Sequence, residues 1–180
     1  MGANANLPSD ISVHWVGNVP ETFHARFSAG SRRYRYVIYN NPIRPALYSK
    51  EVTWNYRPLD EEKMINASQC LVGKHDFSSY RAAGCQANSP IRTLEFLNIN
   101  RFSDFVILDI QANAFLHHMV RNISGVLMAI GAGLYPETWA EEVLHAKDRA
   151  AGGVTAPPYG LYFVNVGYES GYIPNVELGP

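Results

Sequence analysis

The chain has 180 residues, of which 47% are hydrophobic and 17% charged, a composition typical of one globular domain with a real core. No apolar run is long enough to cross a membrane, and residues 1–10 lack the basic-then-apolar pattern of a secretion signal. Only Cys70 and Cys85 are present, so a disulfide framework is not indicated and a reduced cytosolic setting is expected.

The formal net charge of −1 hides an uneven distribution of charge along the chain. Between Thr22 and Lys50 there are six basic residues and no acidic one, whereas the rest of the chain holds nine basic and sixteen acidic residues. Affinity for phosphate depends on local clusters of basic groups rather than on the global sum. The asymmetry therefore indicates an acidic partner at one face of the domain.

The first half of the chain predicts extended structure. Residues 10–16 and 33–39 alternate with a period of two and predict strands, residues 23–27 are expected to be extended, and 52–56 is a shorter strand candidate. Asp60 is a plausible N-cap for a helix that Gly73 ends. Residues 74–90 predict a polar loop that is long for a compact domain, and such loops are often functional.

The second half predicts a hairpin, two helices and a strand. Residues 91–100 and 105–111 form the hairpin, 114–134 is the best helix of the chain, Pro136 opens another helix, and 161–166 is a last strand. Long runs of alternating strand and helix are absent. The order favours an α+β fold, an antiparallel sheet with helices packed on one face.

The strand predicted over 33–39 carries two kinds of chemistry. Alternation places Tyr34 and Tyr36 on one face and Arg33 and Arg35 on the other. Tyrosine rings can stack on bases, and the planar guanidinium group suits phosphate, so the pattern is consistent with a nucleic-acid groove. An ordinary tyrosine-rich edge strand with solvated arginines explains the pattern equally well.

In the helix predicted over 114–134, His117, Arg121 and Ser124 fall on one face. A metal site at His117 and His118 is rejected, because adjacent helical residues point about 100° apart and no further ligand stands at a suitable spacing. Asp109 is a charge among apolar neighbours, and a structural carboxylate is favoured there over a catalytic one. No nucleotide-loop or nucleophile-elbow motif is present.

Five segments together resemble the tRNA pseudouridine synthase A family over nearly the whole chain: NANLPSDI, FHARFSAGSRRYRYVIYN, GKHDFSSYR, ANAFLHHMVRNI and GLYFVNVGY. The resemblance implies a pseudouridine synthase-type fold, of which this chain would be a ferredoxin-like half. It is then one domain over 1–180, with a core at about 8–168 and a tail over 169–180. The family's GRTDAGVHA-type motif, which holds the nucleophilic aspartate, is absent. The chain is therefore expected to be a C-terminal portion without its N-terminal domain, and inactive alone.

The resemblance implies isomerisation of uridine to pseudouridine in the anticodon stem-loop of tRNA by a cytoplasmic homodimer without cofactor or metal. By position, Tyr34 would stack on the target uracil and assist proton removal at its C5. Arg121 would pair with the catalytic aspartate, and Leu161 would pack near the flipped base. Arg26 is a candidate contact to substrate or phosphate. The expected contacts to the RNA backbone are Arg32, Arg33 and Arg35.

Two alternatives remain open. The chain could be a non-catalytic RNA-binding module that uses the Tyr/Arg strand as a stacking platform. It could also be a structural or dimerisation domain built on its well-patterned helices.

Overall fold

The computed structural model describes residues 2–168, which form two compact units. The larger unit is Gly30–Gly167, and residues 2–29 with Tyr168 belong to the other. The predicted tail over 169–180 lies outside the described residues. Within residues 2–168, no helix is both long and apolar enough to cross a bilayer.

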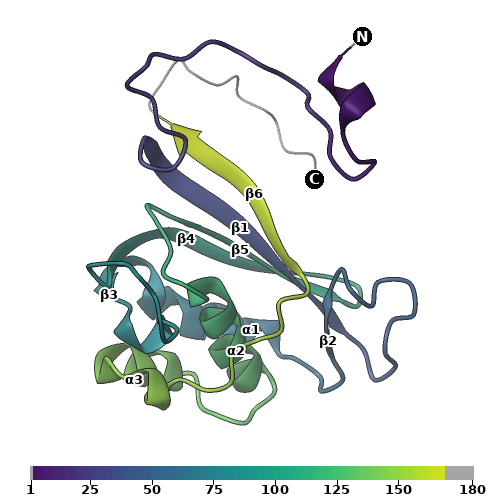
Figure 1. Cartoon of the computed structure of the whole chain (residues 1–180). Helices are drawn as coiled ribbons and strands as arrows, with labels where there is room; N and C mark the ends of the chain where they lie inside the picture. Colours follow the sequence, from purple (N-terminus) through teal and green to yellow (C-terminus); the bar gives the residue numbers. More distant parts are fainter. Residues whose placement is uncertain (1, 169–180) are drawn as a thin grey trace. The chain divides into compact units, whose positions relative to one another are not determined.

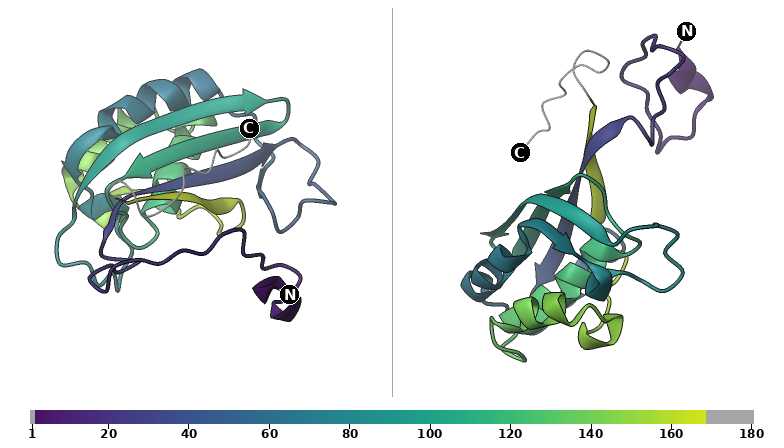
Figure 2. Two further views of the ribbon diagram at one scale, coloured as in Figure 1. Left: turned by 90° about the horizontal axis from the view of Figure 1, so that it is seen from above. Right: turned by 90° about the vertical axis from the view of Figure 1, so that its left-hand side faces the viewer.

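Six strands form one sheet in the order β2-β1-β5-β4-β3, with β6 also paired to β1 (Figure 1). The strand bounds are β1 Ala29–Asn40, β2 Thr53–Asn55, β3 Gly73–Asp76, β4 Ile91–Phe102, β5 Phe105–Ala112 and β6 Leu161–Tyr168. The β1–β5, β4–β5 and β3–β4 pairs are antiparallel, and β1–β2 is parallel. Helices α1 Glu61–Ser68, α2 Met119–Gly131 and α3 Trp139–Ala146 all cover one face of the sheet (Figures 1 and 2). The predicted α+β class, with helices on one face, is confirmed.

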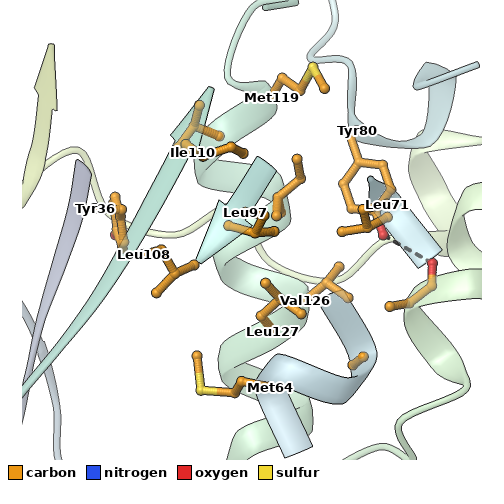
Figure 3. Packing of buried hydrophobic residues seen from close by; sticks show 14 of the residues in the cluster. Tyr36, Met64, Leu71, Tyr80, Leu97, Leu108, Ile110, Met119, Val126 and Leu127 are labelled. Atoms are coloured by element: carbon orange, nitrogen blue, oxygen red, sulfur yellow. Dashed lines mark hydrogen bonds between the residues drawn. The ribbon is translucent and has the colours of Figure 1, made fainter. Parts of the chain in front are cut away.

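The core lies between that sheet face and the helices. The pleat of β5 turns Val106, Leu108, Ile110 and Ala112 inward, and all four are buried. They meet buried residues of the helices, among them Met64, Met119, Val126 and Leu127 (Figure 3). Tyr36 of β1 is fully buried, and its hydroxyl is satisfied by Thr53 Oγ1 at 2.5 Å and Pro157 O at 2.8 Å.

Several predicted elements match their observed counterparts. Asp60 caps α1, where its side chain accepts a hydrogen bond from the Lys63 backbone N–H at 3.2 Å. The hairpin and the last strand run one to two residues longer than predicted. The predicted 52–56 strand is β2, and Val143 and Leu144 lie on the buried side of α3 as expected.

Three segments in the first half of the chain have a secondary structure other than the predicted one. Residues 10–16 form no strand; instead, Asn4 accepts a bond from the Val13 N–H at 2.7 Å and donates to the Val13 carbonyl at 3.0 Å, which occupies the backbone groups that a neighbouring strand would use. Residues 23–27 form no strand: 25–27 are a turn, in which the ring of His24 accepts from the backbone N–H groups of Arg26 and Phe27. The predicted loop over 74–90 contains β3 and a short 3-10 helix, η3 Ser78–Tyr80.

The long helix is shorter than predicted, and Pro136 does not open α3. The α2 helix begins at Met119 rather than at residue 114, because His118 has a left-handed backbone (φ 58°) that a right-handed helix cannot include. The α3 helix begins at Trp139.

Candidate functional site

A pocket of about 300 Å³ opens where β1, α2 and β6 approach one another. Its lining includes Tyr34 of β1, Arg121 of α2 and Leu161 of β6, three residues far apart in the chain. The other lining residues belong to the segment that enters α2 and to its first turn: Phe115, Leu116, His117, His118, Met119 and Val120. The structure therefore brings together three of the side chains that the family resemblance singled out.

Tyr34 is held at the pocket wall by two other aromatic rings. Its ring meets Phe115 edge to face, with centroids 5.2 Å apart and an interplanar angle of 89°, and it meets Phe163 at 5.2 Å and 57°. Burial raises the pKa of Tyr34, and the charge of Arg32 opposes this rise only in part. The hydroxyl therefore stays protonated at neutral pH, and the side chain offers a ring for stacking and an O–H donor.

Arg121 brings a positive charge into a pocket without an acid. Its Nε donates to the carbonyl of Ala156 at 2.7 Å, which fixes the guanidinium group against the segment before β6. Among residues 2–168, Arg121 forms no ion pair, and no carboxylate lines the pocket. A guanidinium group in this position can receive a carboxylate or a phosphate from outside the described part of the chain.

His117 and His118 do not lie on the helix, so the predicted face of His117, Arg121 and Ser124 does not exist. The two imidazole rings lie against each other with centroids 3.9 Å apart and an interplanar angle of 33°. Burial, followed by the charges of Arg121 and His117, lowers the pKa of His118, so its ring is neutral at pH 7. Ser124 is buried and donates to the Val120 carbonyl at 2.9 Å within α2.

The arginines of β1 lie in two different settings. Arg33 and Arg35 lie on the sheet face away from the helices, as the alternation predicted, and both donate to Asp109 of β5, at 2.5–2.7 Å and 3.1 Å respectively. Asp109 is thus a structural carboxylate, as favoured. Arg32 Nη1 donates to the carbonyl of Asn113 at 2.8 Å.

Arg26 belongs to the smaller unit, where its guanidinium group lies over the ring of Phe27, 5.6 Å from the centroid. Within residues 2–168, no group of three or more His, Cys, Asp or Glu side chains is placed to hold a metal ion.

Sequence reasoning did not select Phe115, His118 and Phe163 as parts of this site. Phe115 and His118 fall in the segment predicted as a regular helix, and the sequence does not specify the turn before α2 that brings them to the pocket. Phe163 shares a strand face with Leu161 at a spacing of two, and that alternation was the signal that could have found it.

Comparison with known proteins gives a consistent result. A sequence model of the tRNA pseudouridine synthase family matches residues 67–169. The chain is 60% identical over 181 residues to tRNA pseudouridine synthase A of Pseudomonas aeruginosa, which covers all of this chain and 64% of that protein. It is 54% identical over 180 residues to the Coxiella burnetii protein of the same name, covering 99% of this chain and 69% of that protein. For the Legionella pneumophila protein of that name, the identity is 56% over 176 residues, covering 97% and 67%. The chain thus spans about two thirds of the length of these curated relatives, and it belongs to the tRNA pseudouridine synthase A family.

Proposed function

We propose that this chain forms the substrate pocket of an enzyme that isomerises uridine to pseudouridine in the anticodon stem-loop of tRNA. The observation that carries the proposal is the meeting of Tyr34, Arg121 and Leu161 in one pocket, from three separate elements of a chain in this family. No cofactor enters the proposal. The relatives are named for tRNA, which supports the proposal that the protein acts in the cytoplasm.

The pocket side chains have different roles in binding a flipped uridine. The Tyr34 ring, buttressed by Phe115 and Phe163, stacks on the uracil, and Leu161 packs against the base from β6. Because the pKa of Tyr34 is raised, its side chain is a neutral phenol, which serves as a hydrogen-bond donor and a stacking surface. Removal of the C5 proton by Tyr34 requires a phenolate, and burial disfavours that state.

The nucleophile has to come from outside residues 2–168. The aspartates of that region are Asp10, Asp60, Asp76, Asp104, Asp109 and Asp148, and none of them lines the pocket. We infer that a carboxylate supplied by a further part of the protein pairs with Arg121, whose charge would hold it ionised and oriented. The reaction is then attack by the aspartate, cleavage of the glycosidic bond to N1, rotation of the base and rejoining through C5, which releases the aspartate and the C5 proton while N1 takes up a proton.

A pseudouridine assay on a tRNA transcript tests this proposal with two proteins. One is the 180-residue chain, and the other is the same chain joined to the upstream region of the P. aeruginosa relative. We expect pseudouridine only from the longer protein, and we expect Arg121→Gln in that protein to abolish it. Lys63→Gln on α1 removes the same charge elsewhere and serves as the matched control.

Each outcome separates the alternatives. Activity of the 180-residue chain alone would contradict the external nucleophile. Binding of tRNA without chemistry in both proteins would favour the RNA-binding module. A longer protein that is active with Arg121→Gln would show that the charge at Arg121 has no role in the reaction.

A further inference from the structure

Two arginines bracket the loop between η3 and β4, and neither has an acidic partner among residues 2–168. Arg81 Nη2 donates to the carbonyls of Cys85 and Ala87, at 2.5 and 2.8 Å. Arg92 Nη1 donates to the carbonyls of Ser89 and Ile91, at 2.9 and 2.6 Å. The loop backbone therefore fixes both guanidinium groups in place but leaves their charge unneutralised.

Arg92 has one edge with no acceptor. Its Nε is buried without a hydrogen-bond partner, and within the described part of the chain no other buried side-chain nitrogen or oxygen is in that state. Nε and Nη2 form the side of a guanidinium group that binds two oxygens of a carboxylate or phosphate at once. A buried donor without an acceptor costs free energy, so this edge favours an incoming anion.

The two arginines also affect each other. Burial lowers the pKa of Arg92, and the charge of Arg81 lowers it further, while the nearby Cys85 thiol opposes the shift. Two like charges held on one short loop repel each other unless an anion lies between them. Cys85 is the group between them that can become negative. Burial raises its pKa, but backbone N–H groups and Arg81 outweigh burial and lower it below its ordinary value.

This loop is attached directly to the rim of the pocket. The Ala82 N–H donates to the His117 carbonyl at 3.0 Å, and the His117 N–H donates to Cys85 Sγ at 3.3 Å. His117 and the neighbouring His118, whose ring contacts that of His117, line the pocket with Arg121. An anion held by the loop would therefore lie beside whatever occupies the pocket.

We propose that Arg81 and Arg92 bind a backbone phosphate of the RNA whose base enters the Tyr34–Arg121 pocket. The inference rests on the proposed function, because it takes its ligand from the nucleotide strand expected there. The phosphate accepts from the Nε/Nη2 edge of Arg92, which requires the groups that bury Nε to move aside, and its charge relieves the repulsion between the two arginines.

The first test is the salt dependence of tRNA binding by the wild-type chain and by single variants. Each phosphate contact contributes about 0.7–0.9 to the slope of log K against log salt concentration. Because the two arginines share one phosphate, we expect Arg81→Gln and Arg92→Gln each to reduce that slope, and the double variant to reduce it by about one contact rather than two. Lys63→Gln is the matched control, because it removes the same charge near the opposite end of α2 and should leave the slope unchanged. Cys85→Ala should keep the slope, because the thiol is not the ligand.

The second test observes the Arg92 Nε–H signal by NMR during titration with inorganic phosphate. A shift that Arg81→Gln weakens and Lys63→Gln does not supports the site without any RNA.

Failure of the wild-type chain to bind tRNA would contradict the proposed function, and the phosphate titration would then decide the site alone. If tRNA binds and Tyr34→Ala weakens it, but Arg81→Gln and Arg92→Gln leave the slope unchanged, the phosphate site is wrong and the proposed function stands. A phosphate-induced shift with an unchanged tRNA slope would show a site for the free ion and would also overturn the proposal.

Discussion

Asp109 is the central charge of the sheet face away from the helices. Burial acts to raise its pKa, but hydrogen bonds and charges from Arg33 and Arg35 outweigh burial and lower the pKa below its ordinary value. The arginine side chains are 29% exposed, so solvent screens part of the attraction. The arrangement explains why a charged residue is tolerated among the apolar neighbours of β5: its two partners neutralise it.

Replacing Asp109 with Asn should destabilise the chain by about 2 kcal/mol at pH 7, as expected for the loss of hydrogen bonds between charged groups. Urea unfolding measures this. Asp60→Asn is the control, because it removes an equal charge while an asparagine still caps α1. An equal loss in both variants would show that net charge, and not the contact with Arg33 and Arg35, causes the effect.

The same contact predicts a dependence of stability on pH. A carboxyl group whose pKa is lower in the folded than in the unfolded chain stabilises the fold above the unfolded value, about 3.9. That contribution is lost as the pH falls through the folded pKa. Wild-type unfolding free energy should therefore decline more steeply below about pH 4 than that of Asp109→Asn. Parallel curves for the two proteins over this range would contradict the prediction.

Tyr34 should matter to RNA binding through its ring rather than its hydroxyl. Stacking of a base on an aromatic side chain contributes about 1–3 kcal/mol, so Tyr34→Ala should weaken tRNA binding about five- to 150-fold. Tyr34→Phe keeps the contacts with Phe115 and Phe163 and should stay within a few-fold of wild type. Fluorescence anisotropy with a labelled tRNA transcript measures both variants, and circular dichroism verifies that they are folded. A Tyr34→Phe variant as weak as Tyr34→Ala would show that the hydroxyl is the main contact.

At the scale of the element, α2 depends on a glycine inside the helix. A Cβ on Gly125 would lie 2.0 Å from the carbonyl oxygen of Val154 and 3.3 Å from the backbone nitrogen of Ala156. The close approach lets the segment before β6 pack on α2, where the Ala156 N–H donates to the Arg121 carbonyl at 3.1 Å. Because Gly125 has no side chain, the segment that fixes Arg121 can lie directly against α2.

Gly125→Ala should destabilise the chain although alanine favours helix by about 1 kcal/mol in isolation. The clash is with backbone, which cannot turn away as a flexible side chain can, and overpacking of this kind costs about 1–3 kcal/mol. Thermal unfolding measures the loss. Ala129→Gly in the same helix should lose only the propensity difference of about 1 kcal/mol. A Gly125→Ala variant more stable than wild type would contradict the close packing.

The elements show what the sequence can and cannot predict. The β4–β5 hairpin and the cap of α1 can be predicted from the sequence, because the alternation of residues and a capping carboxylate act within a few residues. The start of α2 is not local: the periodicity of apolar residues continues back to residue 114, and only the left-handed backbone at His118 ends the helix there. Residues 10–16 alternate as a strand does, yet Asn4 holds them in another arrangement.

The candidate site also has features that the sequence predicts and features that it does not. Tyr34, Arg121 and Leu161 were selected by family resemblance, and no spacing in the chain would have placed them in one pocket. The opposite faces of Tyr34 and Arg33 followed from the strand period alone. The partner of Arg33 and Arg35 required the register of β1 against β5, a contact between residues more than 70 positions apart that no local pattern specifies.

At the scale of the whole molecule, the outer sheet face of the larger unit carries an aromatic patch, formed by Tyr39, Tyr48, Phe102 and Phe105. The rings of Tyr39 and Tyr48 lie 5.3 and 6.1 Å from that of Phe105, and Phe102 faces Phe105 across the hairpin. Phe102 is 62% exposed, and the neighbouring loop exposes Ile43 at 76% and Leu47 at 86%. Exposed apolar groups gathered in this way are typical of an interface.

We therefore expect the chain to self-associate through the aromatic patch, in line with the predicted homodimer. Phe102→Glu should weaken association by about tenfold or more, because burial of one phenylalanine contributes about 1.5–3 kcal/mol. Leu134→Glu makes a similar change at an exposed position after α2, on the helix side of the sheet, and should leave association unchanged. Light scattering over a broad concentration range measures all three proteins. Only monomer in the wild-type chain would contradict self-association, whereas equal weakening by both variants would move the interface away from the patch. The patch lies on the sheet face opposite the helices and the Tyr34 side chain. Phe102→Glu should therefore weaken self-association but leave tRNA affinity unchanged. A loss of tRNA affinity in Phe102→Glu would show that self-association and tRNA binding depend on each other.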